Sequence, residues 1–425
     1  MERMGRRNAG ILGTLVAVVV LGAAGCEPQK PAPVRVMALV QTNQGTFSPK
    51  EISLETVGNI VSMEGAAAKL IGGARIVVNF SDPLLTAGGG GLTEDQLRQV
   101  FVKNGGLPPR AAYIEKNGVL WPTDFHTWNM VSMYNNFEQA FKYFQLTRVN
   151  AAEITKPTVY YFPYFAIAGG DGPELEQKDN ALFFLPLRSF ALLPFDQLQQ
   201  VPLAMNSGVI AHEYSHFVFD KRVYEGRAFP QALTAWSGQP QINVLKSLDE
   251  GLADFHAYAA SCHSLTGCNT RWIEPSVGKQ TADDRDIAVT RCLDRSLANA
   301  VNTFSNDLYI QQGLEYRLGT IIAATLYQTS KRVPDSLDAV AQAVVASYSD
   351  ANGTTRGMQE LLIGNLTSPG NVTVELLLNS VMAHTPSQEI RTEMCNRFLD
   401  QLKLERALMP DCPNTAVGGT DCPAL

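Results

Sequence analysis

Apolar residues recur every three or four positions along many stretches of the chain, a spacing that places them on one face of a helix. The clearest case runs from Phe125 to Leu146, where methionines and phenylalanines fill the repeating positions. The same pattern, with capping residues and breakers between stretches, predicts helices over 94–101, from just after Pro202 to near Asp220, and over 247–262, 306–330, 334–349, 355–366, 372–383 and 387–407. The second half of the chain is therefore expected to be mainly helical.

Strand patterns occur in the first half. Three runs rich in β-branched and aromatic residues, bounded by turn residues, predict strands over 74–80, 158–165 and 180–187. Pro186 lies inside the third run, and because proline lacks a backbone N–H this strand is expected at a sheet edge. An edge strand can pair with an extended peptide. The predicted fold class is α+β, with a mixed N-terminal part and a mainly helical C-terminal part.

The N-terminus has the arrangement of an export signal. Three arginines precede a short apolar run over 11–21, and small residues then lead to Cys26. This resembles a bacterial lipoprotein signal with Cys26 as the lipidated first mature residue, although Ala23 stands where such signals usually have Leu. Cleavage near Gly25 without lipidation and an uncleaved anchor are the alternatives. All three predict an exported protein, either held at the bacterial cell envelope or secreted.

The remaining cysteines and the charge agree with export. An even number of cysteines in an exported chain favours disulfides, and none of them has the Cys-x-x-Cys spacing of a thiolate zinc site. They form two groups of three, which implies one bridge between the groups if all pair: Cys262, Cys268 and Cys292, then Cys395, Cys412 and Cys422. The net charge is −7 without any basic stripe, so no nucleic-acid partner is expected.

The stretch His212-Glu213-Tyr214-Ser215-His216 lies inside a predicted helix. Residues four apart share a helix face, so both imidazoles can reach one metal ion, and zinc favours such nitrogen ligands. Glu213 lies beside them and can take a proton from a water that the zinc activates. A catalytic zinc usually has three protein ligands, and Glu250 is the candidate for the third. Asp254 shares its helix face and can accept a hydrogen bond from the far ring nitrogen of a ligating histidine.

His-Glu-x-x-His followed by Glu-x-x-x-Asp resembles the pattern of the gluzincins, the thermolysin-like metallopeptidases. The sequences of the two segments, HEYSH and EGLADF, are most similar to those of the thermolysin and fungalysin families. The resemblance covers about residues 125–330 and implies a zincin-like fold in two parts, with the active-site helix between them. Asn180 and Ala181 resemble the Asn-Ala of the substrate-binding edge strand in that group, which implies that they bind the peptide backbone.

Tyr316-Arg317-Leu318-Gly319 resembles the place where these families carry a His-x-x-Gly pattern. The family histidine stabilises the oxyanion of the tetrahedral intermediate, and here Tyr316 occupies its position. A tyrosine hydroxyl can donate the same hydrogen bond. His384 is the only histidine further along the chain and is the alternative donor.

These features predict a zinc-dependent metallopeptidase that acts on peptides or proteins, with calcium left open as a further cofactor. The expected division is a signal peptide (1–25), a Pro-rich tether (26–37), a β-leaning segment of unknown role (38–120), the catalytic part (121–262) and a helical, cysteine-containing part (263–425). Membrane contact is expected only through a lipid at Cys26. The alternatives are a catalytically silent relative that binds proteins or cell-wall peptides, and a structural lipoprotein without metal.

Overall fold

The structure is a computed structural model. It describes residues 33–423 except 43–45, 80, 83–84, 86–91, 170–171, 197–200, 228–229, 266, 275, 351–355, 418 and 420. The export signal and Cys26 therefore lie outside the described residues, as does the glycine run at 88–91. None of the described helices has both the length and the apolar character needed to cross a membrane.

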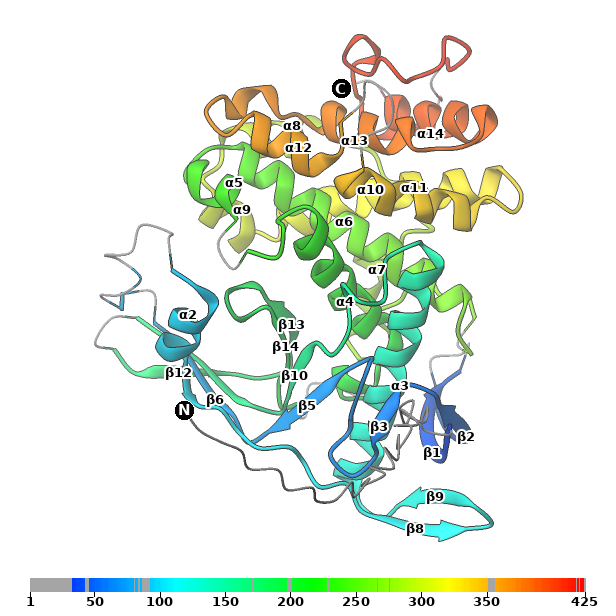
Figure 1. Cartoon of the computed structure of the whole chain (residues 1–425). Coiled ribbons are helices and arrows are strands. Elements are labelled where there is room, and N and C mark those ends of the chain that lie inside the picture. The colour runs from blue at the N-terminus through cyan, green and yellow to red at the C-terminus, as the bar shows by residue number, and fades with distance from the viewer. Residues whose placement is uncertain are drawn as a thin grey trace, which may run out of the picture.

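The chain has an α+β fold, as predicted. Strands gather in the N-terminal half and helices in the C-terminal half, which Figure 1 shows as a lower and an upper layer with helix α4 between them. The helices are α2 (Glu94–Phe101), α3 (Phe125–Leu146), α4 (Ser207–Arg222), α5 (Gln231–Ala235), α6 (Gln241–Cys262), α7 (Lys279–Asp284), α8 (Arg295–Thr303), α9 (Asn306–Gln311), α10 (Leu314–Arg332), α11 (Leu337–Ser349), α12 (Met358–Gly364), α13 (Val374–Ala383) and α14 (Gln388–Gln401).

The described strands form three sheets. The first has the order β2-β1-β9-β8, with β1 (Val34–Gln41), β2 (Phe47–Leu54), β8 (Tyr113–Lys116) and β9 (Val119–Pro122). The second has the order β13-β14-β10-β5-β4-β3, with β3 (Val57–Asn59), β4 (Glu64–Gly65), β5 (Lys69–Gly72), β10 (Thr158–Tyr161), β13 (Ala181–Phe184) and β14 (Ser189–Leu192). The third has the order β12-β11-β6-β7, with β6 (Arg75–Asn79), β7 (Val102–Asn104), β11 (Tyr164–Ala168) and β12 (Glu174–Gln177).

The segment 38–120 contributes strands to two sheets that later residues also build. Its strand β5 pairs in parallel with β10, and its strand β6 pairs in parallel with β11. The segment therefore builds part of the same sheets as the residues that follow it. Strand β1 already begins at Val34, so the last residues of the expected tether (26–37) belong to a sheet instead.

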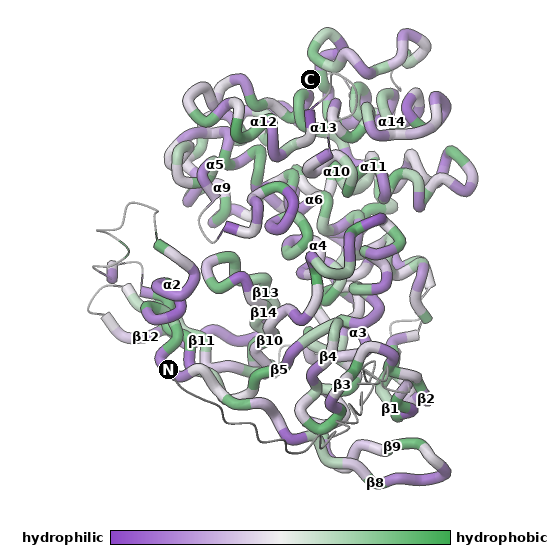
Figure 2. Tube along the Cα trace, viewed as in Figure 1, coloured by the Kyte–Doolittle hydropathy of each residue, from purple (hydrophilic) through white to green (hydrophobic). Residues whose placement is uncertain are grey.

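Two predicted strands differ from the structure because of local backbone geometry. The run 158–165 is broken at Phe162, which has a positive φ of 48° and precedes a proline, so β10 and β11 enter different sheets. The run 180–187 ends as a strand at Phe184 and continues as a 3-10 turn that contains Pro186. The predicted edge position is nevertheless confirmed, because β13 is the outermost strand of its sheet. Figure 2 shows β13 and β14 mostly in the green of apolar residues.

Three disulfides join the six described cysteines: Cys262–Cys268, Cys292–Cys422 and Cys395–Cys412. The expected single bridge between the two cysteine groups is thus Cys292–Cys422, which ties the C-terminal segment to the loop before α8. Such bonds form and persist in oxidising compartments, so they are compatible with an exported protein.

Candidate metal centre

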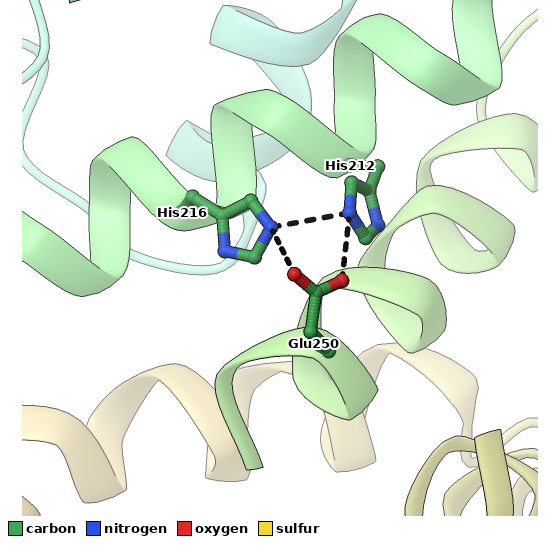
Figure 3. A group of neighbouring side chains, drawn as sticks. All are labelled: His212, His216 and Glu250. Carbon is green, nitrogen blue, oxygen red and sulfur yellow. Dashed lines mark hydrogen bonds and ion pairs between the residues drawn. The ribbon is translucent and has the colours of Figure 1, made fainter. Parts of the chain in front are cut away.

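Helix α4 carries both motif histidines on one face. Its N-terminus is capped by Asn206, whose side-chain oxygen accepts hydrogen bonds from the backbone N–H groups of Gly208 and Val209. The helix packs against β13 on one side and against α6 on the other. Its turn spacing brings Nε2 of His212 and Nε2 of His216 to 3.1 Å from one another, as Figure 3 shows.

Helix α6 brings the third predicted ligand to the same point. Oε2 of Glu250 lies 3.3 Å from Nε2 of His212, and Oε1 lies 3.7 Å from Nε2 of His216. One ligand atom from each of the three residues lies within 4.8 Å of the others. The structure therefore assembles a His-His-Glu group that can hold a metal ion.

A carboxylate stands behind each histidine. Oδ1 of Asp249 lies 2.8 Å from Nδ1 of His216, and Oδ1 of Asp254 lies 3.1 Å from Nδ1 of His212, although the second contact is not aligned as a hydrogen bond. A carboxylate at Nδ1 favours a proton there and leaves the lone pair on Nε2. Asp254 was expected in this role. Asp249 was missed, because consecutive helix residues do not share a face and only the packing of α6 against α4 shows that Asp249 reaches His216.

The charges explain why a cation fits between these side chains. With both Nδ1 atoms protonated, two Nε2 lone pairs and the Glu250 carboxylate converge on one buried point, where only a proton or a metal ion relieves their repulsion. Burial alone would lower the pKa of His216, but Asp249 and Glu250 raise it to about 10. Burial alone would raise the pKa of Glu250, but the histidines and Arg285 lower it. Two imidazoles and one carboxylate are a donor set that suits zinc.

Glu213 lies in the same cavity, on the side of the histidines that faces the sheet. It is buried, and its Oε2 accepts a hydrogen bond of 2.7 Å from the backbone N–H of Phe183 in β13. Burial raises the pKa of Glu213, while the neighbouring histidines oppose that rise. The contact with Phe183 also shows that the outer edge of β13 faces α4.

Two residues without a sequence motif complete the wall of the centre. The guanidinium of Arg285 donates from Nη2 to Glu250 over 3.2 Å and to Asp254 over 2.5 Å. The ring of Trp272 stacks on His212 with a centroid distance of 4.5 Å and an interplanar angle of 9°. Arg285 thus links Glu250 to the Asp254 carboxylate at Nδ1 of His212, and Trp272 stacks on the plane of that imidazole. Both lie outside the regular helices around the site, where no periodicity could identify them.

Tyr316 lies in the first turn of α10 and lines the cavity, and its side chain is 40% exposed. The Arg285 guanidinium sits 4.4 Å above its ring. The alternative residue His384 is elsewhere: it ends α13, its Nδ1 contacts the Ser380 carbonyl over 2.7 Å, and it lines a separate cavity. Of the two, only Tyr316 is near the metal centre.

Two glycines explain how α6 and α10 approach each other behind Glu250. A Cβ added to Gly251 would lie 2.5 Å from the carbonyl oxygen of Gly319, and one added to Gly319 would lie 2.9 Å from the amide nitrogen of Gly251. The backbones therefore touch where the sequence patterns around Glu250 and Tyr316 each contain a glycine. This crossing sets how the helix turns that carry Glu250 and Tyr316 lie relative to each other.

A cavity of about 300 Å³ opens over the metal group and contains both predicted substrate-binding residues. Asn180 and Ala181 line it at the start of β13, where Oδ1 of Asn180 accepts a hydrogen bond of 2.9 Å from the Ala181 N–H. In β13, residues two apart turn their N–H and C=O groups to the same edge. The N–H and C=O of Ala181 therefore point to the same edge as those of Phe183, with the Ala181 N–H bonded to Asn180 and the Phe183 N–H bonded to Glu213.

Comparisons with known proteins add no family assignment. No protein-family model matches the chain, and a search of curated proteins found no match. The resemblance to the gluzincins stays a prediction that rests on motif spacing and on the geometry above.

Proposed function

We propose that this protein is a zinc-dependent metallopeptidase, and that it acts as an endopeptidase outside the cytoplasm. One observation carries the proposal: His212, His216 and Glu250 converge on one point of a cavity that also holds Glu213 and the outer edge of a strand. A metal group, a carboxylate base and a peptide-pairing edge within one cavity are the parts that hydrolysis of a peptide bond requires.

The zinc would be held by the three converging side chains, with Asp249 and Asp254 orienting the imidazoles. When bound, zinc lowers the pKa of a water molecule and polarises a carbonyl group. The donor set and the converging lone pairs support zinc as the ion.

Glu213 is the general base in this proposal. Its Oε2 is held by the Phe183 N–H, which leaves Oε1 to accept a proton from the attacking water. Burial raises the pKa of Glu213, which strengthens it as a base and lets it pass the proton on to the leaving amine.

The oxyanion would be stabilised by Arg285 and Tyr316. Nη1 of Arg285 makes no hydrogen bond to any described residue, so its N–H groups are available to a substrate oxygen in the cavity. The negative charge of Glu250 and burial raise the pKa of Tyr316, so its hydroxyl remains a donor at neutral pH. Donors placed where charge develops stabilise a transition state more than a ground state.

The substrate would bind as an extended strand along the outer edge of β13. Ala181 offers its C=O there, while its N–H donates to Oδ1 of Asn180 beside it at the cavity rim. Strand addition uses backbone atoms, so it aligns peptides of many sequences. The export signal and the disulfides support an extracytoplasmic site of action, at the envelope if Cys26 is lipidated.

Cleavage of a peptide library by the full chain tests this proposal. We expect zinc-loaded protein to cleave unstructured peptides internally, and we expect the activity to disappear on chelation and in Glu213→Ala. A zinc-loaded protein that leaves the whole library intact would contradict the peptidase and favour the catalytically silent binder. Activity that persists in Glu213→Ala would remove Glu213 from the mechanism.

A further inference from the structure

The catalytic cavity has two chemically different ends. Helix α6 runs antiparallel to α4, because Asp254 contacts His212 while Asp249, earlier in α6, contacts His216. Lys246 lies one turn before Glu250, and so toward the C-terminal end of α4. The residues lining the cavity at the two ends are Leu203, Val209, Ile273 and Val277 at the apolar end, and Asp220, Tyr224 and Lys246 at the charged end.

The acids near the charged end already have partners. Oδ2 of Asp220 accepts from Nε of Arg188 over 3.1 Å, and Asp249 is held by His216 over 2.8 Å. Glu250 belongs to the metal group and contacts Arg285. Each of these carboxylates is thus matched by a cation other than Lys246.

Lys246 differs from the three carboxylates just described, because it has no ion-pair partner within 4.0 Å among the described residues. Its side chain is half-buried. Glu315 at the start of α10 is near enough for the charge of Lys246 to lower the pKa of its carboxyl group, although burial, the largest effect, raises that pKa. The two side chains do not form an ion pair within 4.0 Å, and Oε2 of Glu315 has no hydrogen-bond partner among the described residues. A half-buried ammonium group has lost part of its hydration. An anion that enters the cavity compensates for this loss by forming a charge-assisted hydrogen bond with the ammonium group.

We propose that Lys246 determines specificity by binding a carboxylate of the substrate at the charged end of the cavity. The inference rests on the proposed function, because the substrate is the peptide that lies along β13. The carboxylate is either an acidic side chain close to the scissile bond or the C-terminal carboxylate of a short peptide. Both offer the same chemistry to an ammonium group, and Lys246 lines the cavity that holds the metal group.

Three peptides of one parent sequence test the inference. One is neutral and amidated, one carries a scanned Glu and is amidated, and one is neutral with a free C-terminus. We expect Lys246→Gln to lower the ratio of kcat/KM for a carboxylate peptide over the neutral peptide about tenfold, or about 1.4 kcal/mol, mainly through KM. The exposed Lys50 in β2 gives the matched control, Lys50→Gln.

Each outcome decides the inference. A reduced ratio for the Glu peptide identifies a side-chain carboxylate, and a reduced ratio for the free C-terminus identifies the terminal one. Ratios that stay the same in Lys246→Gln for both carboxylate peptides would overturn it, as would the same loss in Lys50→Gln.

A binding measurement separates this inference from the proposed function. Zinc-loaded Glu213→Ala protein is titrated with the same peptides, with and without Lys246→Gln. If the wild type cleaves no peptide, the peptidase proposal fails, but about tenfold weaker binding of the carboxylate peptides alone still supports Lys246. Equal affinities with and without Lys246→Gln would reject Lys246 whether or not the protein is a peptidase.

Discussion

Replacing Gly251 by alanine tests whether the glycine crossing of α6 and α10 holds the metal centre in place. The added Cβ would lie 2.5 Å from the carbonyl oxygen of Gly319 and 3.0 Å from its Cα and carbonyl carbon. All three atoms belong to the backbone, so no side chain can rotate away. The two helices must separate by about 0.9 Å to restore an ordinary contact. Glu250 directly precedes Gly251 and moves with α6.

The magnitude follows from two opposing effects. Overpacking in a well-packed interior costs about 1–3 kcal/mol, and a clash with a rigid backbone lies at the upper end of that range. Alanine in a helix regains about 1 kcal/mol relative to glycine. The free energy of unfolding should therefore fall by about 2 kcal/mol. A chain of this size has an unfolding entropy of roughly 0.8 kcal/mol/K, so the Tm should fall by about 2–3 °C.

Calorimetry in the presence of a chelator measures this stability change without the contribution of bound metal. Competition with a chromophoric chelator then measures zinc affinity, which should fall about tenfold as Glu250 shifts. Gly364→Ala is the matched control, because Gly364 ends α12 and an added Cβ meets only the flexible Arg356 side chain at 3.4 Å. Its Tm should stay the same or rise by about 1 °C. A Gly251→Ala protein as stable as Gly364→Ala would refute the reasoning.

Three further predictions concern the residues around the metal. Tyr316→Phe should lower kcat by about 10²–10³ with unchanged zinc content, and equal rates would remove the hydroxyl from catalysis. Asp249→Asn should weaken zinc binding about 10–100-fold in chelator competition, and an unchanged affinity would show that His216 needs no carboxylate behind it. In metal-free protein the pKa of His216 is raised to about 10. Its positive charge therefore adds fully to the free energy of unfolding below about pH 6.5, and this contribution is lost as the pH rises through about 10. Urea unfolding of chelated protein should show this loss, and a His216→Gln variant with the same pH dependence would contradict it.

The metal group was predictable from sequence because its geometry is mostly local. Residues four apart share a face in any helix, so His212 and His216 could be paired before the fold was known. The bounds of α2 and α3 were also predicted correctly, since capping residues and an apolar face define them within the helix itself. Asp249 was missed, because it directly precedes Glu250 and consecutive helix residues do not share a face.

The parts that depend on distant contacts were not predictable. Arg285 and Trp272 reach the centre from irregular segments, and only the packed structure shows that they touch Asp254 and His212. The predicted helix 306–330 is two helices, α9 and α10, because Gly313 between them has a positive φ of 63°. The predicted helix at 247 begins at Gln241 instead, since its first turns are buried against distant residues such as Val301.

The central claim is that the group formed by His212, His216 and Glu250 binds one zinc ion. Metal analysis of the full chain, after incubation with zinc and removal of the excess by gel filtration, tests it most directly. We predict about one zinc per chain in the wild type and in Lys50→Gln, and almost none in the doubly substituted His212→Ala, His216→Ala protein. A wild type that retains no zinc, or a double variant that retains as much as the wild type, would contradict the claim.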